Sequence, residues 1–159
     1  MFIRELEKQD IPEVLQLTAA MHRESPFYNK YAYSEQKVLD LTNVFLTNED
    51  WFCVVAEHND RLVGFMAVTI IPTFFGFDNF VEDVSFFVEP VSRGTSAAIR
   101  LVRAVEVWAL SRGAETIRCG VTTGVREDGA HSFFIKLGYE NTGQLYTKLI
   151  SPLNSDPTR

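Results

Sequence analysis

The hydrophobic positions along this chain follow two patterns, one typical of β-strands and one typical of α-helices. Runs of apolar, β-branched and aromatic residues predict strands over residues 2–6, 51–57, 62–71, 81–88, 116–121 and 139–150. Apolar residues spaced three and four apart predict helices that begin near Asp10, Ser34, Ser96 and Asp128. The expected order of elements is therefore β-α-α-β-β-β-α-β-α-β.

Polar residues mark where these elements should begin and end. Asp10 stands before Pro12 and three residues before Glu13, a spacing that predicts a capping box at the start of the first helix. Ser34 can cap the second helix through its hydroxyl group. The segment 58–61 has the composition of a hairpin turn between two strands.

The order of the elements predicts a mixed sheet. The strand-helix-strand unit from Val81 to Val121 should place two parallel strands side by side at the centre, and the other strands should be antiparallel. We expect an α/β fold of the α+β type, with about four helices and about six strands, or about seven if the last strand is broken near Gly143. Residues 1–150 should form a single domain, and the polar segment 151–159 a loose C-terminal tail.

Composition and charge narrow the classes of function. The net charge of −6 argues against a sequence-independent nucleic-acid binder, which needs a basic surface for phosphate contacts. No apolar run reaches the length of a membrane span, and Arg4 and Glu5 interrupt the N-terminus where a signal peptide would be apolar. Cys53 and Cys119 should be buried free thiols in a reducing compartment, with a disulfide as the alternative. We therefore expect a cytoplasmic protein without nucleic-acid or membrane partners.

The most informative segment runs from Asp83 to Ala98, where an apolar strand leads through Pro90 into a loop of small residues and then into a long helix. The loop consists of Arg93, Gly94, Thr95, Ser96, Ala97 and Ala98. Small side chains let backbone N–H groups approach an anion closely, and the helix dipole adds about half a positive charge. The segment predicts a phosphate cradle, with an ordinary connecting loop as the alternative. It is neither a Walker loop nor a GxGxxG fingerprint.

This segment resembles the acyl-coenzyme A binding segment of the GNAT superfamily of N-acetyltransferases. The loop of that family has the form Gln/Arg-x-x-Gly-x-Gly/Ala. Arg93 and Ala98 match it, and Ser96, at the usual position of a glycine, fits if its φ angle is negative. The segment AHSFFIKLGYENTGQ is similar to the family's second signature, which is matched by Ala130, Phe133, Lys136, Gly138 and Tyr139. The resemblance extends from Phe2 to Ile150 and implies the same fold.

The resemblance implies an acyltransferase that uses acetyl coenzyme A as a cosubstrate. The acetyl group would pass directly to a primary amine of a small molecule or a protein within a ternary complex, without an acyl-enzyme. Backbone amides from Arg93 to Ala98 would hold the pyrophosphate, with the Arg93 side chain near the phosphates. Main-chain groups of Phe86, Phe87 and Val88 would pair with the pantetheine arm, while their side chains join the core. A homodimer is also compatible with this family.

The reaction needs a base for the ammonium group of the acceptor. Glu82 and Asp83 lie side by side on the strand before the loop, and strand alternation sends them to opposite faces, so at most one should face the cleft. A carboxylate partly buried in a sheet can have a raised pKa and act directly or through water. The alternatives are a solvated strand start, a salt bridge, or a chain of waters without a dedicated base.

The general acid is where the sequence departs from the family. The usual tyrosine falls at Phe134, which has no hydroxyl group, and the usual asparagine falls at Glu127, which cannot make all the bonds of an amide. Four residues could replace the tyrosine: His131, Ser132, Tyr139 and Tyr146. These departures favour an alternative function, a coenzyme A-binding or protein-interaction module with weakened catalysis.

Two aromatic linkers, residues 26–34 and 72–80, are expected to form the acceptor pocket, because the resemblance places it where they would meet. Tyr28, Tyr31, Phe75 and Phe77 would be its walls. Alternatively, these aromatic residues close the core or form a dimer surface. The histidines and cysteines are dispersed and show no metal-site spacing, so no metal is expected.

Overall fold

A five-stranded sheet lies at the centre of the protein in a computed structural model that describes residues 1–148. The strands are β1 (Phe2–Glu5), β2 (Trp51–His58), β3 (Arg61–Pro72), β4 (Asn79–Val88) and β5 (Ile117–Arg118). The helices are α1 (Ile11–Glu24), α2 (Glu35–Thr47), α3 (Ala97–Ser111) and α4 (Glu127–Lys136). The connections contain 3₁₀ turns η1 (Lys8–Asp10), η2 (Tyr28–Lys30) and η3 (Pro90–Ser92). The predicted tail, residues 151–159, lies outside the described residues.

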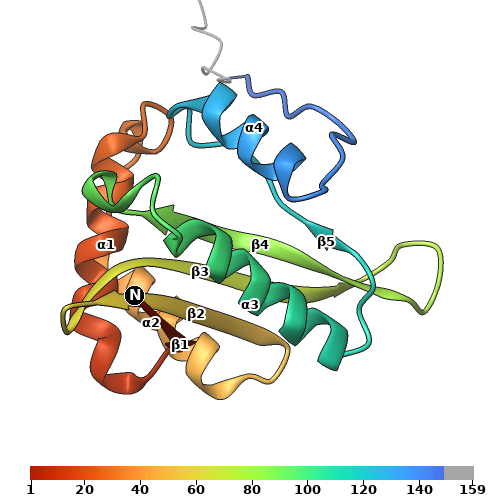
Figure 1. Ribbon diagram of the computed structural model, residues 1–159, viewed down its shortest axis with the longest axis horizontal. Coiled ribbons are helices and arrows are strands. Elements are labelled where there is room, and N and C mark those ends of the chain that lie inside the picture. The colour runs from red at the N-terminus through yellow and green to blue at the C-terminus, as the bar shows by residue number, and fades with distance from the viewer. Residues whose placement is uncertain (149–159) are drawn as a thin grey trace, which may run out of the picture.

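The strands lie in the order β1-β2-β3-β4-β5 (Figure 1). β1 to β4 are antiparallel neighbours, whereas β5 is parallel to β4 and follows it through α3. The predicted fold class is confirmed, since the described part of the chain has a mixed, mostly antiparallel sheet with one parallel pair and four helices.

The two C-terminal strands differ from their predictions. β5 contains two residues instead of 116–121, and residues 139–148 form no strand, while residues 149 and 150 lie outside the described residues. The described sheet therefore has five strands rather than six or seven, and the parallel pair lies at its edge rather than at its centre. The physical reason is that residues 140–148 are mostly polar, apart from Leu145 and Tyr146, and that so short a β5 offers few backbone groups to a further strand.

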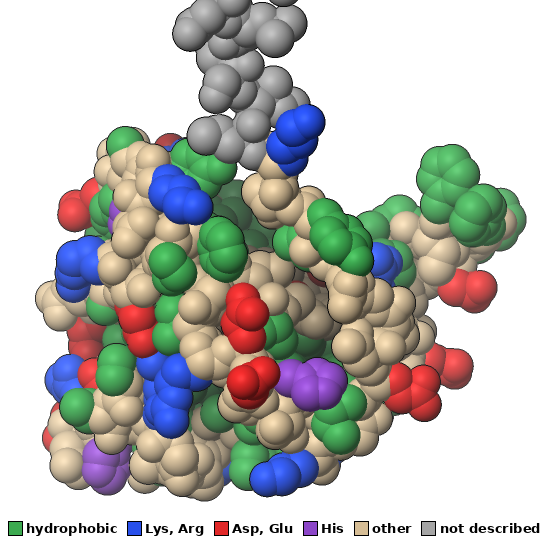
Figure 2. Space-filling view, turned by 90° about the horizontal axis from the view of Figure 1, so that it is seen from above, with side chains coloured by type: hydrophobic (Ala, Val, Ile, Leu, Met, Phe, Trp, Pro, Cys, Tyr) green, Lys and Arg blue, Asp and Glu red, His purple; other side chains and the backbone are tan. Residues whose placement is uncertain are grey.

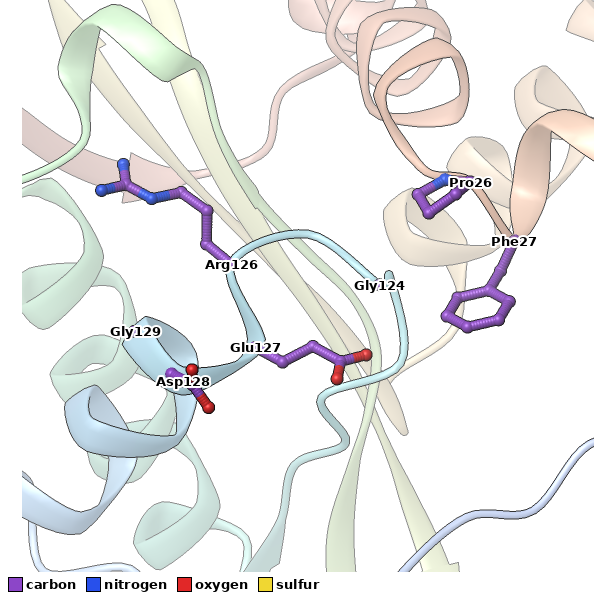
Figure 3. Close-up of a pocket in the computed structure, with 7 residues that line it drawn as sticks. All are labelled: Pro26, Phe27, Gly124, Arg126, Glu127, Asp128 and Gly129. Carbon is purple, nitrogen blue, oxygen red and sulfur yellow. The ribbon is translucent and has the colours of Figure 1, made fainter.

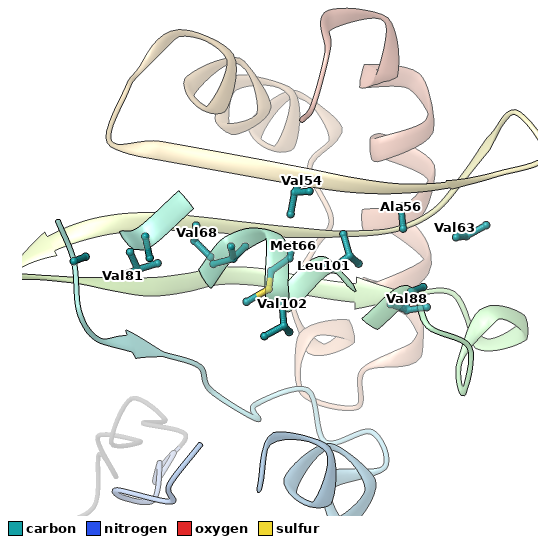
Figure 4. Close-up of a cluster of buried hydrophobic side chains, with 13 residues drawn as sticks. Val54, Ala56, Val63, Met66, Val68, Val81, Val88, Leu101 and Val102 are labelled. Atoms are coloured by element: carbon teal, nitrogen blue, oxygen red, sulfur yellow. The ribbon is translucent and has the colours of Figure 1, made fainter. Parts of the chain in front are cut away.

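Both faces of the sheet are covered. α1 and α2 pack on one face and α3 on the other, where side chains of α4 also pack against the core (Figure 1). On the α3 face, Leu101 and Val102 fit between strand side chains such as Val54, Met66 and Val81 (Figure 4). The middle of β3 is buried on both faces, which explains why its sequence is an unbroken apolar run without alternation.

Most element boundaries follow from local chemistry. The Ser34 hydroxyl accepts the N–H of Lys37 at the start of α2, as predicted. Asn59 and Asp60 form the predicted hairpin turn with φ angles of 51° and 56°, a conformation that these two residue types tolerate. The predicted capping box of α1 is wrong, because the carboxylate of Asp10 does not cap that helix.

Buried Asp10 is instead held in a partly exposed ion-pair network. Its two carboxylate oxygens lie 2.6 and 2.8 Å from the guanidinium nitrogens of Arg4, and one also accepts the N–H of Glu7. Arg4 reaches Glu57 at 2.9 Å through Nε, which ties β1 to β2 and to the start of α1. Burial acts to raise the pKa of Asp10, but the bonds from Arg4 and the Glu7 amide outweigh it, so the pKa lies below its ordinary value.

We expect the change Arg4→Met to destabilise the fold by roughly 3 kcal/mol, because it leaves Asp10 buried without its partner. In the variant, burial should raise the pKa of Asp10, so that Asp10 binds a proton on folding. The loss of free energy of unfolding should therefore be largest at about pH 7 and shrink as the pH falls towards about 5. Urea unfolding at both pH values measures it.

Arg103→Met is the matched control, since Arg103 forms an exposed pair with Glu106 one helical turn away. We expect it to change the free energy of unfolding by less than about 1 kcal/mol at either pH. Equal losses for the two arginine variants would contradict a structural role for the Arg4–Asp10 pair.

Candidate active site

The sheet opens at its β4–β5 edge. β5 pairs with β4 only through Val81–Ile117 and Glu82–Arg118, whereas β4 continues to Val88. After β5 the chain turns away from β4 and runs to α4 (Figure 1). Within the described residues, the outer edge of β4 therefore faces no strand beyond Glu82, and its backbone groups are available to an extended partner.

A β-bulge lies where the sheet opens. Ala67 pairs with Ser85 and Val68 pairs with Asp83, so Val84 is an extra residue without a partner on β3. A bulge bends its strand and increases the local twist, and it changes which side chains point to each face. β4 therefore changes direction next to the last residues that pair with β5.

A cavity of about 480 Å³ reaches through this opening. One side is formed by α1, the segment 28–34 and α2, and the other by residues 83–86 of β4 with Gly120, Thr122 and Thr123. It thus joins the α1–α2 face of the sheet to the outer edge of β4. Its volume is that of a site for a small molecule.

Asp83 lines this cavity and Glu82 does not. The two carboxylates lie on opposite faces of the sheet, since Asp83 pairs with Val68, which packs towards α3, and Glu82 pairs with Thr69 on the other face. Asp83 reaches the cavity at the open edge of β4, beside Gly120. The Asp83 carboxylate accepts the N–H of Gly120 at 2.8 Å. Burial, and to a lesser degree the charge of Glu82, raises the pKa of Asp83, against the lowering effect of the Gly120 amide. The predicted separation of the two carboxylates onto opposite faces is thus what the structure has.

Cys119 lies beside Asp83 but is unsuited to be a nucleophile. Burial, together with the negative charge of Asp83, raises the pKa of Cys119 to about 12. Both cysteines of the chain are free thiols, and burial also raises the pKa of Cys53 to about 12. The reactive thiolate is therefore scarce at neutral pH.

The small-residue loop lies between η3 and α3. Gly94 has a φ angle of +84°, which favours glycine, and Ser96 has a φ angle of −73°, so its side chain is accommodated without strain. Thr95 Oγ1 accepts the N–H of Ala97 at 3.3 Å. The N–H groups of Gly94, Ser96 and Ala98 have no protein acceptor in the described part of the chain. Since Gly94 to Ser96 are exposed, these N–H groups can meet an anion at the positive end of α3.

The side chain of Arg93 is bound by groups of α1 and β4. Its guanidinium makes two 2.6 Å bonds to the carboxylate of Glu24 at the end of α1, and its Nε donates to the carbonyl of Val88 at 2.8 Å. It also lies over the ring of Phe87, 5.5 Å from the ring centroid. Its expected position near the phosphates stays a prediction. Arg93 fixes the loop against β4 and α1.

Phe86, Phe87 and Val88 lead from the open edge into this loop. The side chains of Phe87 and Val88 are buried on opposite faces of the sheet, and Phe86 packs towards α4, so all three side chains join the core as predicted. The Val88 carbonyl is occupied by Arg93. The pantetheine role of the three main chains stays a prediction.

A second cavity lies at the start of α4 (Figure 3). Glu127, at the position of the family's asparagine, points across it towards Phe27, whereas Arg126 points away. Arg126 has left-handed backbone angles, φ 48° and ψ 45°. Arg93 is the main cause that holds the pKa of Glu24 below the ordinary value, and the charge of Arg126 contributes to a smaller degree. Positive charge thus gathers around the end of α1.

The two aromatic linkers do not meet. Tyr28 and Tyr31 line the 480 Å³ cavity, as their predicted position requires. Phe75 and Phe77 do not, because β3 and β4 continue past the body of the protein and carry the connecting loop away from α1 (Figure 1). Both rings are fully exposed, and the hydrophobic tip projects at the right of Figure 2. They are therefore neither walls of this cavity nor part of the core, and a dimer surface stays a prediction for them.

No hydroxyl group replaces the family's tyrosine in its own position. Phe134 packs in an aromatic cluster with Phe86, Phe133 and Tyr139. The Tyr139 hydroxyl is buried and has no hydrogen-bond partner among the described residues, and burial raises its pKa. Tyr146 is exposed and bonds to Gln144. His131 and Ser132 are exposed on α4.

Three polar contacts in and around the cavity were not predicted from the sequence. Buried Ser25 donates to the carbonyl of Thr123 at 2.6 Å, and the hydroxyl groups of Tyr28 and Thr122 lie 3.0 Å apart. Glu24 is the partner of Arg93. Each contact joins segments distant in the chain, and the only local signal was that Ser25 precedes a proline at the end of a helix.

Two negative findings concern residues 1–148. No group of three or more His, Cys, Asp or Glu side chains there is arranged to bind a metal ion. None of the helices in this part combines the length and the apolar character needed to span a bilayer.

Solved structures share this fold at low sequence identity. AAC(6′)-Iy, in complex with the bisubstrate analogue CoA-S-monomethyl-acetylneamine, has a TM-score of 0.78 and 16% identity, over 95% of this chain and 98% of that one. The aminoglycoside 6′-N-acetyltransferase AAC(6′)-Ig from Acinetobacter haemolyticus has a TM-score of 0.72 and 18% identity, over 95% and 100%. A ribosomal-protein-alanine N-acetyltransferase from Brucella melitensis has a TM-score of 0.69 and 17% identity, over 94% and 100%.

Sequence comparison gives the family. A search among curated proteins gave no match to this chain. The model of the acetyltransferase (GNAT) family matches residues 12–139, which include the open edge of β4, the small-residue loop and α4. The protein therefore belongs to the GNAT family of acetyltransferases.

Proposed function

We propose that this protein transfers an acetyl group from acetyl coenzyme A to a primary amine within a ternary complex. The observation that carries the proposal is the open outer edge of β4, with a cavity that reaches through the opening and a partly buried carboxylate in its wall. The complex of AAC(6′)-Iy with an analogue that contains coenzyme A supports the use of an acyl-coenzyme A.

The two substrates would approach from different sides. The free N–H groups of Gly94, Ser96 and Ala98 suit the pyrophosphate of acetyl coenzyme A. The unpaired edge of β4 beyond Glu82 suits the pantetheine arm, whose amides can pair with a strand. The acceptor amine would enter from the α1–α2 side, between Tyr28, Tyr31 and the bulge.

Asp83 is the base in this proposal. An alkyl ammonium group has a pKa near about 10, so it must lose a proton before its nitrogen can attack. The raised pKa of Asp83 makes its carboxylate a better proton acceptor than an ordinary aspartate. The amine nitrogen then attacks the thioester carbonyl, a C–N bond replaces the C–S bond, and the second amine proton leaves to solvent or to the thiolate. A thiol pKa near about 8.5 allows that thiolate to depart without an acid at the position of Phe134.

A second candidate function is a coenzyme A-binding module with weak catalysis, favoured by Phe134 and the unpaired Tyr139 hydroxyl. Both functions need the cofactor, and only the first needs deprotonation of an amine. We propose the cytoplasm as the compartment, in keeping with two free thiols.

Acetyl coenzyme A should raise the unfolding temperature. At a hundred times its dissociation constant a ligand adds about 2.7 kcal/mol, and each kcal/mol corresponds to about 2–4 °C for a chain of this size. Ser96→Asp should weaken binding at least about tenfold, because it places a negative charge beside the phosphates. Aspartate is a good helix N-cap, so the variant should fold.

Ser111→Asp places the same charge at the other end of α3 and should keep the full shift. Thermal unfolding of the three proteins with and without acetyl coenzyme A gives the answer. An equal shift in both variants would remove the loop from the proposed cofactor site.

Asp83→Asn should lower kcat by about 10² or more, because the amide cannot accept the proton yet can still accept the Gly120 N–H. Activity of the unchanged protein should rise with pH as Asp83 loses its proton, at a pH above the ordinary aspartate pKa of about 3.9. This rise of activity with pH should be absent in the variant. Release of the coenzyme A thiol, measured across pH, reports both effects.

Glu82→Gln is the matched control, since Glu82 lies next in the chain but outside the cavity. It should keep kcat within about twofold. If Asp83→Asn also retains kcat and the rise of activity with pH, deprotonation through water without a dedicated base replaces Asp83 in this proposal.

A further inference from the structure

We propose that the acceptor is a monoamine with an apolar body, and not a polycation of the aminoglycoside kind. This inference rests on the proposed function, because it concerns the amine side of the same cavity. Three properties of the cavity support this inference: its wall is largely apolar, the charges in the wall are balanced, and most of its polar groups are already hydrogen-bonded.

The wall on the acceptor side is largely apolar. Side chains from α1, α2 and the sheet form it, among them Val14, Met21, Leu41, Phe45 and Phe65. Leu41 remains 38% exposed in the free protein although it faces this cavity. An alkyl or aryl body placed here would remove apolar surface from water on both partners, at about 25 cal/mol per Å².

The charge of the wall is balanced although the protein is acidic. The chain has 21 acidic and 15 basic residues, yet Asp83 is the one carboxylate that lines the cavity, and Lys37 is the one lysine or arginine, within the described residues. A single ammonium group can pair with Asp83. A second would have no carboxylate in the wall and would share the cavity with Lys37, which has the same sign of charge.

The polar groups of the wall are mostly engaged with one another. Thr18 Oγ1 lies 3.0 Å from the Tyr33 hydroxyl, and His22 Nε2 lies 2.9 Å from the Tyr31 carbonyl. Tyr28 is bonded to Thr122. A polycation would bring several ammonium groups out of water, and each would need acceptors that these bonds already use. An apolar body needs none.

Hexylamine and 1,6-diaminohexane test the inference directly, because they differ by one ammonium group at the far end of the same chain. With acetyl coenzyme A at saturation, we expect kcat/KM from thiol release to be at least about tenfold higher for hexylamine. 2-Phenylethylamine should resemble hexylamine, and neamine should resemble the diamine. A preference for the diamine or for neamine would overturn the inference.

Lys37→Glu should narrow the gap between the two amines. Lys37 is exposed in the first turn of α2, so the change should be tolerated, and a carboxylate there can pair with a second ammonium group. The ratio of kcat/KM between hexylamine and the diamine should fall several-fold. Lys8→Glu, an exposed change of equal charge outside the cavity, should leave the ratio unchanged. Equal ratios in all three proteins would contradict the role given to the charge of the wall.

Binding of acetyl coenzyme A distinguishes a failure of the proposed function from a failure of the inference about the acceptor. No thermal shift with acetyl coenzyme A would remove the proposed function itself. If the shift occurs but no amine is acetylated, the amines are compared by the further shift each produces in the presence of coenzyme A. A shift by hexylamine no larger than that by the diamine would overturn the inference and leave the cofactor site intact.

Discussion

The short pairing between β4 and β5 is the constraint on which the rest of the site depends. Two pairs of residues join these parallel strands, and the bulge at Val84 then bends β4 where the pairing stops. A complete β5 would satisfy the outer edge of β4 and leave no way through the sheet. Because the edge is open, a cavity reaches from the α1–α2 face to the outer edge of β4, and Asp83 becomes a wall residue. The carboxylate gains its raised pKa from the same arrangement, since it lies between strands that no longer pair and yet is shielded from water.

Arg93 connects the two halves of this site. It holds Glu24, at the end of the helix that lines the acceptor side, and Val88, at the end of the strand that leads to the small-residue loop. Ser25, the next residue after Glu24, fastens the same end of α1 to Thr123. The acceptor wall and the proposed cofactor loop therefore share one anchoring point, and their relative position is fixed by side-chain bonds rather than by the sheet alone.

Sequence patterns predicted the parts of the molecule that local chemistry determines. The period of the apolar residues located all four helices and the long strands, and the composition of 93–98 identified the loop, including the tolerated Ser96. The predictions that failed concern contacts and positions that depend on distant parts of the chain. Asp10 is predicted to cap α1 because its spacing to Glu13 is ordinary for a cap, but its carboxylate is bonded to Arg4 and to the N–H of Glu7, which precedes the helix. Phe75 and Phe77 are predicted as pocket walls because the family resemblance places the pocket where the two linkers meet, and the sequence does not show how far the β3–β4 hairpin projects. The partner of Arg93 lies 69 residues away and has no local signal.

The surroundings of Cys119 also bear on how the protein withstands oxidants. Because burial raises the pKa of Cys119 far above neutral pH, its thiol forms very little thiolate there. Peroxides and disulfides react with the thiolate, so this sulfur should resist conversion to sulfenic acid or to a mixed disulfide although it lies next to Asp83. A protein that releases a free thiol product at every turnover would thus carry beside its proposed base a cysteine that does not exchange with that product.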